Sequence, residues 1–233
     1  MNKQAENQNN ELAHPIKLVI FDCDGVLVDS EMICVEVLIG ELKKIDVVIS
    51  VDYFYQHFLG RSFAHVKGTI LDSFNVVLGT DFESNYQQRL LQVFETRLQP
   101  TADVRLVLEQ LQIPYCVATS SSVHRTKKAL ELTGLSDFFV AKVFTASQVK
   151  NGKPAPDLFL FAAQKMGVKP DDCLVIEDSI AGIQAAQAAG MLVWQYLGGS
   201  HMTQEKDRCA EERSSITTFS HWQDFDKMTA SLQ

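Results

Sequence analysis

Four short apolar runs recur along the chain, and their hydrophobic residues do not alternate with polar ones. They read KLVIF (17–21), YCVAT (115–119), CLVIE (173–177) and LVWQY (192–196). Runs rich in β-branched and aromatic residues are typical of strands that a parallel sheet buries on both faces. A weaker run, KVFTA (142–146), has the same character. The pattern therefore predicts five strands of a parallel sheet.

Segments with apolar residues at helical spacing lie between these runs. They predict helices over 103–112, 122–134, 156–167 and 179–190. The last three begin at serine or proline and end at glycine, which are the usual start and stop residues of helices. Strands that alternate with helices indicate βαβ units, and hence an α/β, doubly wound, Rossmann-like core.

Residues 31–100 break this alternation. They contain no convincing buried strand and four helix-like segments, at 31–45, 51–60, 63–74 and 85–98. The prediction is a small helical-bundle cap over 31–100, inserted into a core made of 14–30 and 101–233. Such an insertion would lie above the carboxyl edge of the sheet, where open α/β folds bind ligands. A helical extension packed elsewhere is the alternative.

The two ends of the chain carry less pattern. Residues 1–13 are polar and lack the apolar stretch of a secretory signal, so they predict a disordered lead-in. The segment that begins at Gly198 is polar and poorly patterned, and SHWQDFDKMTASL (220–232) predicts a last helix. No stretch approaches the ~18 apolar residues of a membrane span, so no membrane partner is expected.

Charge and cysteine content narrow the functional class. The 233 residues carry a formal net charge of -8 without a basic face, so no nucleic-acid partner is expected. The five cysteines form no C-x-x-C pair, which disfavours disulfides and zinc and favours a reduced, cytoplasmic setting. Cys23 is expected to pack in the core. A monomer or weak homodimer is expected.

Polar side chains follow the predicted strands at or just beyond the end of each run. They are Asp22 and Asp24, Thr119 and Ser120, Lys153, and Glu177 and Asp178. Because the carboxyl ends of parallel strands meet at one edge, these side chains should converge. Crowded carboxylates need a cation, and hard oxygen ligands favour Mg²⁺. With a lysine for the phosphate, one carboxylate can attack phosphorus while a second transfers protons.

Four segments resemble, in order, the motifs of the haloacid dehalogenase superfamily. They are DCDGVLVDS (22–30), VATSSS (117–122), KPAPDLF (153–159) and EDSIAGI (177–183). The helical insertion resembles the small cap of the subgroup that contains β-phosphoglucomutase and sugar-phosphate phosphatases such as those acting on 6-phosphogluconate. The resemblance implies a Mg²⁺-dependent phosphatase that hydrolyses a small phosphorylated metabolite, a sugar phosphate or phosphosugar acid, through an aspartyl phosphate.

The resemblance also implies roles for the strand-end carboxylates. Asp22 would be the nucleophile and a metal ligand. Asp24 would be the general acid and base, with its backbone carbonyl on the metal. Asp178 would be the main remaining metal ligand. Glu177 would either bind the metal directly or hold one of the groups that bind it.

The same resemblance assigns the phosphoryl group to Thr119 and Lys153, assisted by the backbone of Ser120. Other polar neighbours are given ordinary roles. Asp29 and Ser30 are interpreted as a turn or helix cap without a catalytic role, and Ser179 as a helix cap. His124 and Arg125 are interpreted as solvated helix residues that border the site at most.

Within the cap, Arg61, His65 and Lys67 surround a glycine-marked turn. In this subgroup such a segment often faces the substrate, so the three are candidates for holding its non-reacting part. A solvated helix face is an equally good interpretation.

Two positions separate a phosphatase from a mutase. Cys34 stands where β-phosphoglucomutase has a histidine, and Phe63 where it has an arginine. Both departures favour a hydrolase, although Arg61 leaves the mutase open as an alternative. A phospho-accepting receiver-like signalling module is an alternative of another class, but receivers are shorter and lack both the cap and the second aspartate. A catalytically silent metabolite-binding protein fits the intact residue set less well.

Overall fold

Six parallel strands form a single sheet in the computed structural model, which describes residues 15–202 and 216–229. The strand order is β3-β2-β1-β4-β5-β6. The predicted lead-in (1–13) lies outside the described residues. The strands are β1 (Leu18–Phe21), β2 (Tyr115–Thr119), β3 (Val143–Thr145), β4 (Cys173–Glu177), β5 (Leu192–Tyr196) and β6 (Thr217–Phe219).

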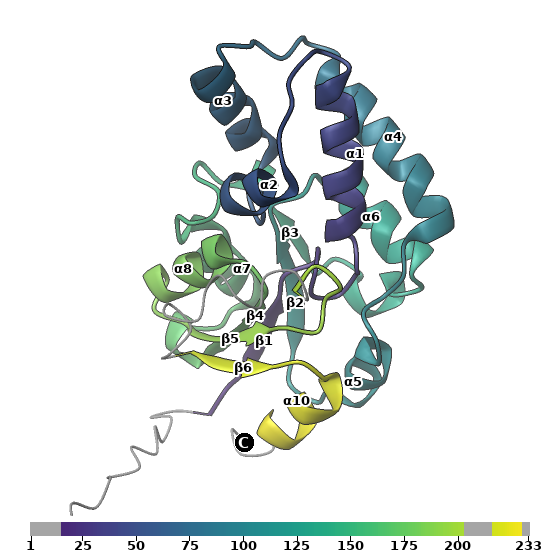
Figure 1. Cartoon of the computed structure of the whole chain (residues 1–233). Coiled ribbons are helices and arrows are strands. Elements are labelled where there is room, and N and C mark those ends of the chain that lie inside the picture. The colour runs from purple at the N-terminus through teal and green to yellow at the C-terminus, as the bar shows by residue number, and fades with distance from the viewer. Residues whose placement is uncertain (1–14, 203–215, 230–233) are drawn as a thin grey trace, which may run out of the picture.

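Helices cover both faces of this sheet (Figure 1). Leu18 and Ile20 of β1 pack in a cluster with α7 and α8, whereas Val19 and Phe21 pack with α5, α6 and α10. The alternation of β1 side chains between two apolar layers confirms the doubly wound α/β prediction. These helices are α5 (Val104–Gln110), α6 (Val123–Leu132), α7 (Asp157–Met166), α8 (Ile180–Ala188) and α10 (Trp222–Thr229).

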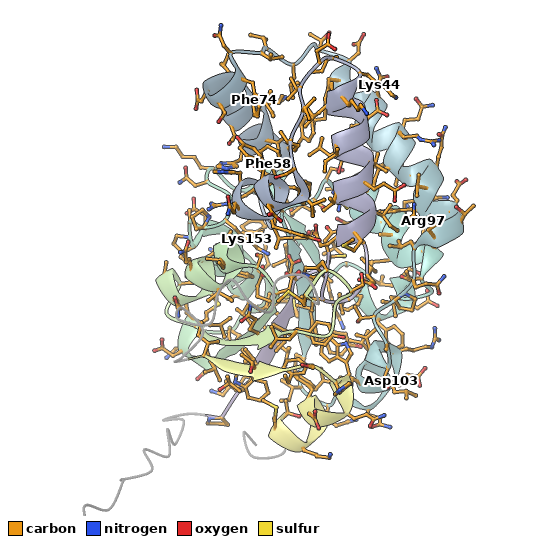
Figure 2. All side chains as sticks on the ribbon, viewed as in Figure 1. Lys44, Phe58, Phe74, Arg97, Asp103 and Lys153 are labelled. Carbon is orange, nitrogen blue, oxygen red and sulfur yellow. The ribbon has the colours of Figure 1, made fainter. Side chains whose placement is uncertain are left out.

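Four further helices stand between β1 and β2 in the chain, and we call them the inserted helices. Figure 1 shows them above the sheet, and Figure 2 shows Lys44 and Phe74 at their far end, with Lys153 at the level of the sheet edge. Leu42, Ile70 and Leu90 are fully buried among them. The inserted helices are α1 (Glu31–Lys43), α2 (Val51–His57), α3 (Phe63–Phe74) and α4 (Phe82–Arg97).

Helix starts near the sheet edge follow the capping signals of the sequence. The Ser122 hydroxyl accepts a hydrogen bond from the Arg125 amide at the start of α6. The Ser179 hydroxyl accepts one from Gly182 at the start of α8, which confirms Ser179 as a cap. These caps begin both helices just beyond strand ends. Over residues 15–202 and 216–229, no helix has the length and apolar run that a membrane crossing requires.

The segment beyond Gly198 is polar and poorly patterned, and none of the five predicted strands lies in it. The structure nevertheless has a sixth strand there, β6. This strand has three residues, only one of them buried, so it carries no hydrophobic run. Helix α10 packs against it through aromatic rings, because the Phe219 ring of β6 lies 5.3 Å from Trp222 and 5.7 Å from Phe225 between ring centres. The Trp222 ring stacks on Tyr196 at 4.8 Å between ring centres, and its indole N–H donates to Thr101.

Gly182 sets how closely α8 approaches the end of β4. A Cβ added to Gly182 would lie 1.8 Å from Glu177 Oε1. We therefore expect Gly182→Ala to lower the free energy of unfolding by about 2 kcal/mol through overpacking, measured by urea denaturation.

Gly40 provides the matched control because it also lies inside a helix, α1, but an added Cβ there meets no atom within 4 Å. Gly40→Ala should raise the free energy of unfolding by about 1 kcal/mol, since alanine favours helix. Equal stability of Gly182→Ala and the unaltered protein would contradict the close packing of α8 on β4.

Candidate functional site

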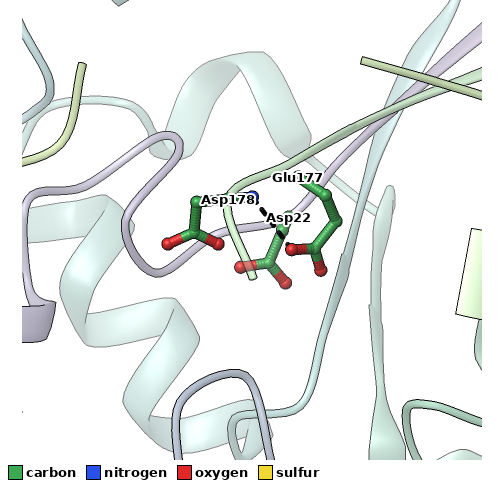
Figure 3. Close-up of side chains that lie close together, drawn as sticks. All are labelled: Asp22, Glu177 and Asp178. Atoms are coloured by element: carbon green, nitrogen blue, oxygen red, sulfur yellow. Dashed lines mark hydrogen bonds between the residues drawn. The ribbon is translucent and has the colours of Figure 1, made fainter. Parts of the chain in front are cut away.

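Three carboxylates gather at the carboxyl edge of the sheet (Figure 3). Asp22 follows β1, Glu177 is the last residue of the neighbouring strand β4, and Asp178 comes directly after it. One oxygen from each lies within 4.8 Å of the others, and all three side chains are buried. The structure therefore brings these three predicted residues together.

Lys153 is the cation of this cluster. Its Nζ donates to Asp22 Oδ1 at 2.5 Å, to Glu177 Oε1 at 2.6 Å and to the Ala118 carbonyl at 3.1 Å. The side chain is 0% exposed. A lysine buried this completely needs its carboxylate partners, so Lys153 is locked to the end of β1 and the end of β4.

Burial dominates the electrostatics of the cluster. It raises the pKa of Asp22 well above its usual value, although Lys153 opposes this shift. Burial and the neighbouring Glu177 likewise raise the pKa of Asp178. For Lys153, burial acts to lower the pKa, but Asp22 and Glu177 outweigh burial and leave it raised.

The donor set fits a hard divalent cation. Three buried carboxylates face one amine, so the ionised cluster would carry more negative charge than Lys153 neutralises, and a bound cation would favour that ionised form. Carboxylate oxygens are the ligands that Mg²⁺ prefers. Glu177 Oε2 already accepts from the backbone N–H groups of Asp178 and Ser179 and from the Ser179 hydroxyl, each at 2.9 Å. The orientation of the Glu177 carboxylate is therefore fixed by hydrogen bonds.

His201 is a neighbour of the cluster that sequence reasoning missed. Its Nε2 lies 2.9 Å from Asp178 Oδ2, and its side chain is fully buried. Gly25 makes this contact possible, because a Cβ there would lie 2.0 Å from Asp178 Oδ2 and 2.9 Å from the His201 ring. The sequence around His201 has no hydrophobic pattern. Its one signal is the preceding glycine pair, which allows the backbone to pass close to other atoms.

Asp24 does not join the three carboxylates. Its Oδ1 accepts from the Ser30 hydroxyl and from Arg125 Nη2, both at 2.6 Å, and its Oδ2 accepts from the Ser121 hydroxyl at 2.5 Å. Burial acts to raise the pKa of Asp24, but Arg125 and the two hydroxyls outweigh burial and hold the pKa below its usual value.

The contact with Asp24 corrects the interpretation of Arg125 as a solvated residue. Its side chain is only 12% exposed, whereas His124 is exposed as expected. Ser30 stands at the start of α1, but its hydroxyl makes no cap bond there because it binds Asp24 instead. Cys23, between the two aspartates, is buried in the apolar core as predicted.

The residues at the end of β2 connect the sheet to the inserted helices. Thr119 is buried, and its hydroxyl accepts from the Ser121 N–H at 3.1 Å. The Ser120 hydroxyl donates to the Gly60 carbonyl at 2.9 Å. Arg61 Nη1 donates to the Lys153 carbonyl at 3.2 Å. The turn between α2 and α3 therefore rests directly on the sheet edge.

A cavity of about 330 Å³ lies between the sheet edge and the inserted helices. Among the predicted site residues, those that line it are Asp22, Asp24, Thr119, Ser120 and Arg61. His65 and Lys67 are exposed and do not line it, so their predicted contact with the substrate stays a prediction. Lys67 instead forms an exposed ion pair with Glu83, at 3.1 Å.

The cavity also contains an acid that the sequence did not single out. Glu31, the first residue of α1, is buried and lines the cavity. Burial, with a smaller contribution from Asp24, raises its pKa to about 8. Glu31 is thus neutral in the folded protein over much of the pH range in which it would be ionised in the unfolded chain.

Comparison with known proteins gives consistent matches. The family model of haloacid dehalogenase-like hydrolases matches residues 16–190. The chain is 26% identical over 207 residues to 6-phosphogluconate phosphatase of Escherichia coli (strain K12), covering 88% of this chain and 91% of that protein.

Solved structures agree. A haloacid dehalogenase-like protein of unknown function from Agrobacterium tumefaciens superimposes with a TM-score of 0.75 at 32% identity, covering 93% of this chain and 99% of that one. A protein described as a putative beta-phosphoglucomutase from Bacteroides vulgatus gives a TM-score of 0.72 at 25% identity, covering 94% and 89%.

Glu31 yields a prediction for stability against pH. Between its usual value of 4.5 and about 8, the unfolded chain loses the Glu31 proton while the folded protein keeps it, so stability falls as pH rises through this window. Glu31→Gln removes this loss. In urea denaturation with EDTA, the free energy of unfolding of the variant should increase relative to that of the unaltered protein as pH rises, by on the order of 4 kcal/mol across the window.

Glu36→Gln on the same helix is the control, because the Glu36 side chain is 62% exposed. Its effect should stay within about 0.5 kcal/mol at every pH. A Glu31→Gln difference that does not change with pH would contradict the burial of a neutral Glu31.

Proposed function

The chain belongs to the haloacid dehalogenase-like hydrolases, and we propose that it is a Mg²⁺-dependent phosphatase of a small phosphorylated metabolite. The substrate class is a sugar phosphate or phosphosugar acid, hydrolysed through an aspartyl phosphate on Asp22. Relatives named as phosphatases of 6-phosphogluconate, fructose 1-phosphate and hexitol phosphates support this class. The observation that carries the proposal is that Asp22 lines the cavity and is paired there with the buried cation of Lys153.

In the first step Asp22 attacks phosphorus. The bond from phosphorus to the ester oxygen breaks as the carboxyl proton of Asp24 moves to that oxygen. In the second step the Asp24 carboxylate takes a proton from water, and the water oxygen bonds to phosphorus and displaces the Asp22 carboxylate. Arg125 favours the ionised form of Asp24, which is the form the second step requires.

Charge neutralisation is divided among fixed groups. Lys153, the Thr119 hydroxyl and the Ser120 backbone would hold the phosphoryl oxygens. Asp22, Asp178 and the Asp24 carbonyl would hold Mg²⁺, with Glu177 orienting the cluster. When bound, the ion supplies positive charge to the phosphoryl group.

The inserted helices, within the predicted cap of 31–100, would choose the substrate. The cavity they enclose suits a compact metabolite, and Arg61 is the predicted cap residue that reaches it. Arg61 donates to the backbone carbonyl of Lys153, so its guanidinium is held against the segment that carries this lysine. We assign Arg61, and not His65 or Lys67, to the non-reacting part of the substrate.

The mutase remains the second candidate because of the structural likeness to the protein described as a putative beta-phosphoglucomutase. Cys34 and Phe63 both line the cavity, so the positions where the mutase carries histidine and arginine here present a thiol and a ring. Neither side chain carries a charge that would hold a second phosphate. The inserted helices and the buried proton-transfer candidate Asp24 disfavour a receiver-like module.

The nucleophile assignment predicts that Asp22→Asn loses at least about 10³-fold in turnover, since an amide is a poor nucleophile. The measurement is phosphate release from p-nitrophenyl phosphate with Mg²⁺. Asp72→Asn, an exposed change of the same kind on α3, should leave turnover unaltered. Comparable turnover in Asp22→Asn and the unaltered protein would rule out Asp22 as the nucleophile.

A panel of phosphorylated metabolites separates phosphatase from mutase. We expect phosphate release from sugar phosphates or phosphosugar acids at a kcat/KM above that for p-nitrophenyl phosphate. β-Glucose 1-phosphate should yield inorganic phosphate without glucose 6-phosphate. Formation of glucose 6-phosphate faster than phosphate would instead establish the mutase.

A further inference from the structure

Three donors from three separate segments hold the Asp24 carboxylate. Ser30 precedes α1, Ser121 follows β2, and Arg125 lies in the first turn of α6. Both carboxylate oxygens are engaged, at 2.5–2.6 Å. Charge-assisted bonds this short are among the strongest in proteins. The direction of this carboxylate is therefore imposed by its surroundings and not by its own rotamer preference.

Arg125 is the one charged donor of the three, and the inserted helices fix its position. The same Nη2 that binds Asp24 also lies 3.1 Å from Cys34 Sγ on α1. The guanidinium carbon lies 5.8 Å from the centre of the Phe94 ring on α4. A planar guanidinium can donate to the carboxylate from its edge while its face lies over an aromatic ring. A lysine ammonium has no plane and cannot combine the two contacts in this way.

The two aspartates thus have separate cations. Asp22 binds Lys153, and Asp24 binds Arg125. Proton transfer depends on placing the donor within hydrogen-bond reach of the reacting oxygen, and a small error in placement greatly lowers the rate. A group that aims Asp24 would therefore affect the proton-transfer steps and leave the attack by Asp22 intact.

We propose that Arg125 is the positioning residue for Asp24, aiming its carboxyl group at the ester oxygen and then at water. This inference rests on the proposed phosphatase function. Arg125 acts through Asp24 and makes no contact with the reacting phosphorus. Its anchors Cys34 and Phe94 make the aim of Asp24 depend on side chains of the inserted helices.

The test compares two aryl phosphates in the first turnover. Nitrophenolate leaves phosphorus without a proton, whereas phenolate gains from one. Arg125→Lys keeps the charge but loses the planar fork. It should slow phenol release from phenyl phosphate about 10²-fold and nitrophenol release from p-nitrophenyl phosphate less than about threefold, with KM for both unchanged within about twofold.

Three further variants test the same interpretation. In an Asp24→Asn background, Arg125→Lys should cause no additional loss, because Arg125 acts only through Asp24. Arg89→Lys, an exposed change on α4, is the matched control. Ser121→Ala removes a second donor to Asp24 and should give the same pattern in weaker form, including where Arg125→Lys fails to fold.

Other outcomes overturn the inference. An equal loss on both esters would make Arg125 a structural residue, a raised KM would make it a substrate-binding residue, and an additive loss in the Asp24→Asn background would place its action elsewhere. Failure of the proposed function looks different, because the unaltered protein would then release phosphate from neither ester.

Discussion

The buried ion pair of Lys153 with Asp22 and Glu177 is the constraint on which the rest of the structure depends. An ammonium that is 0% exposed, at 2.5 Å and 2.6 Å from two carboxylates, costs several kcal/mol if either side is lost. It joins the loop after β3 to the ends of β1 and β4. The ion pair therefore fixes the position of Asp22, which lines the cavity.

Charge at this edge of the sheet is distributed in two separate pairs. Lys153 stabilises Asp22, and Arg125 stabilises Asp24, so two acidic residues only two positions apart in sequence occupy different electrostatic surroundings. The pKa of Asp22 is raised by burial, and that of Asp24 is lowered by its donors. The repulsion expected between neighbouring carboxylates is thus relieved by giving each its own cation, as different chemical tasks require.

Sequence patterns predicted the parts of the molecule that topology dictates. Strand ends such as Asp22 converge because parallel strands share one carboxyl edge. Arg125 could not be placed, because a helix pattern does not reveal that the first turn of α6 faces a buried acid. The ion pair of Lys67 could not be predicted because its partner Glu83 comes from another helix. His201 and β6 lie in a segment without hydrophobic periodicity, so only tertiary contacts define them.

In the proposed phosphatase reaction, Asp22 forms a covalent bond to the phosphoryl group. Borohydride reduces an acyl phosphate to an alcohol, so quenching the enzyme with borohydride during turnover marks the carboxylate that carried phosphate. Peptide mass spectrometry should then find the reduced side chain at residue 22. A modification confined to another carboxylate, or an unmodified peptide in samples quenched during rapid phosphate release, would contradict the aspartyl phosphate at Asp22.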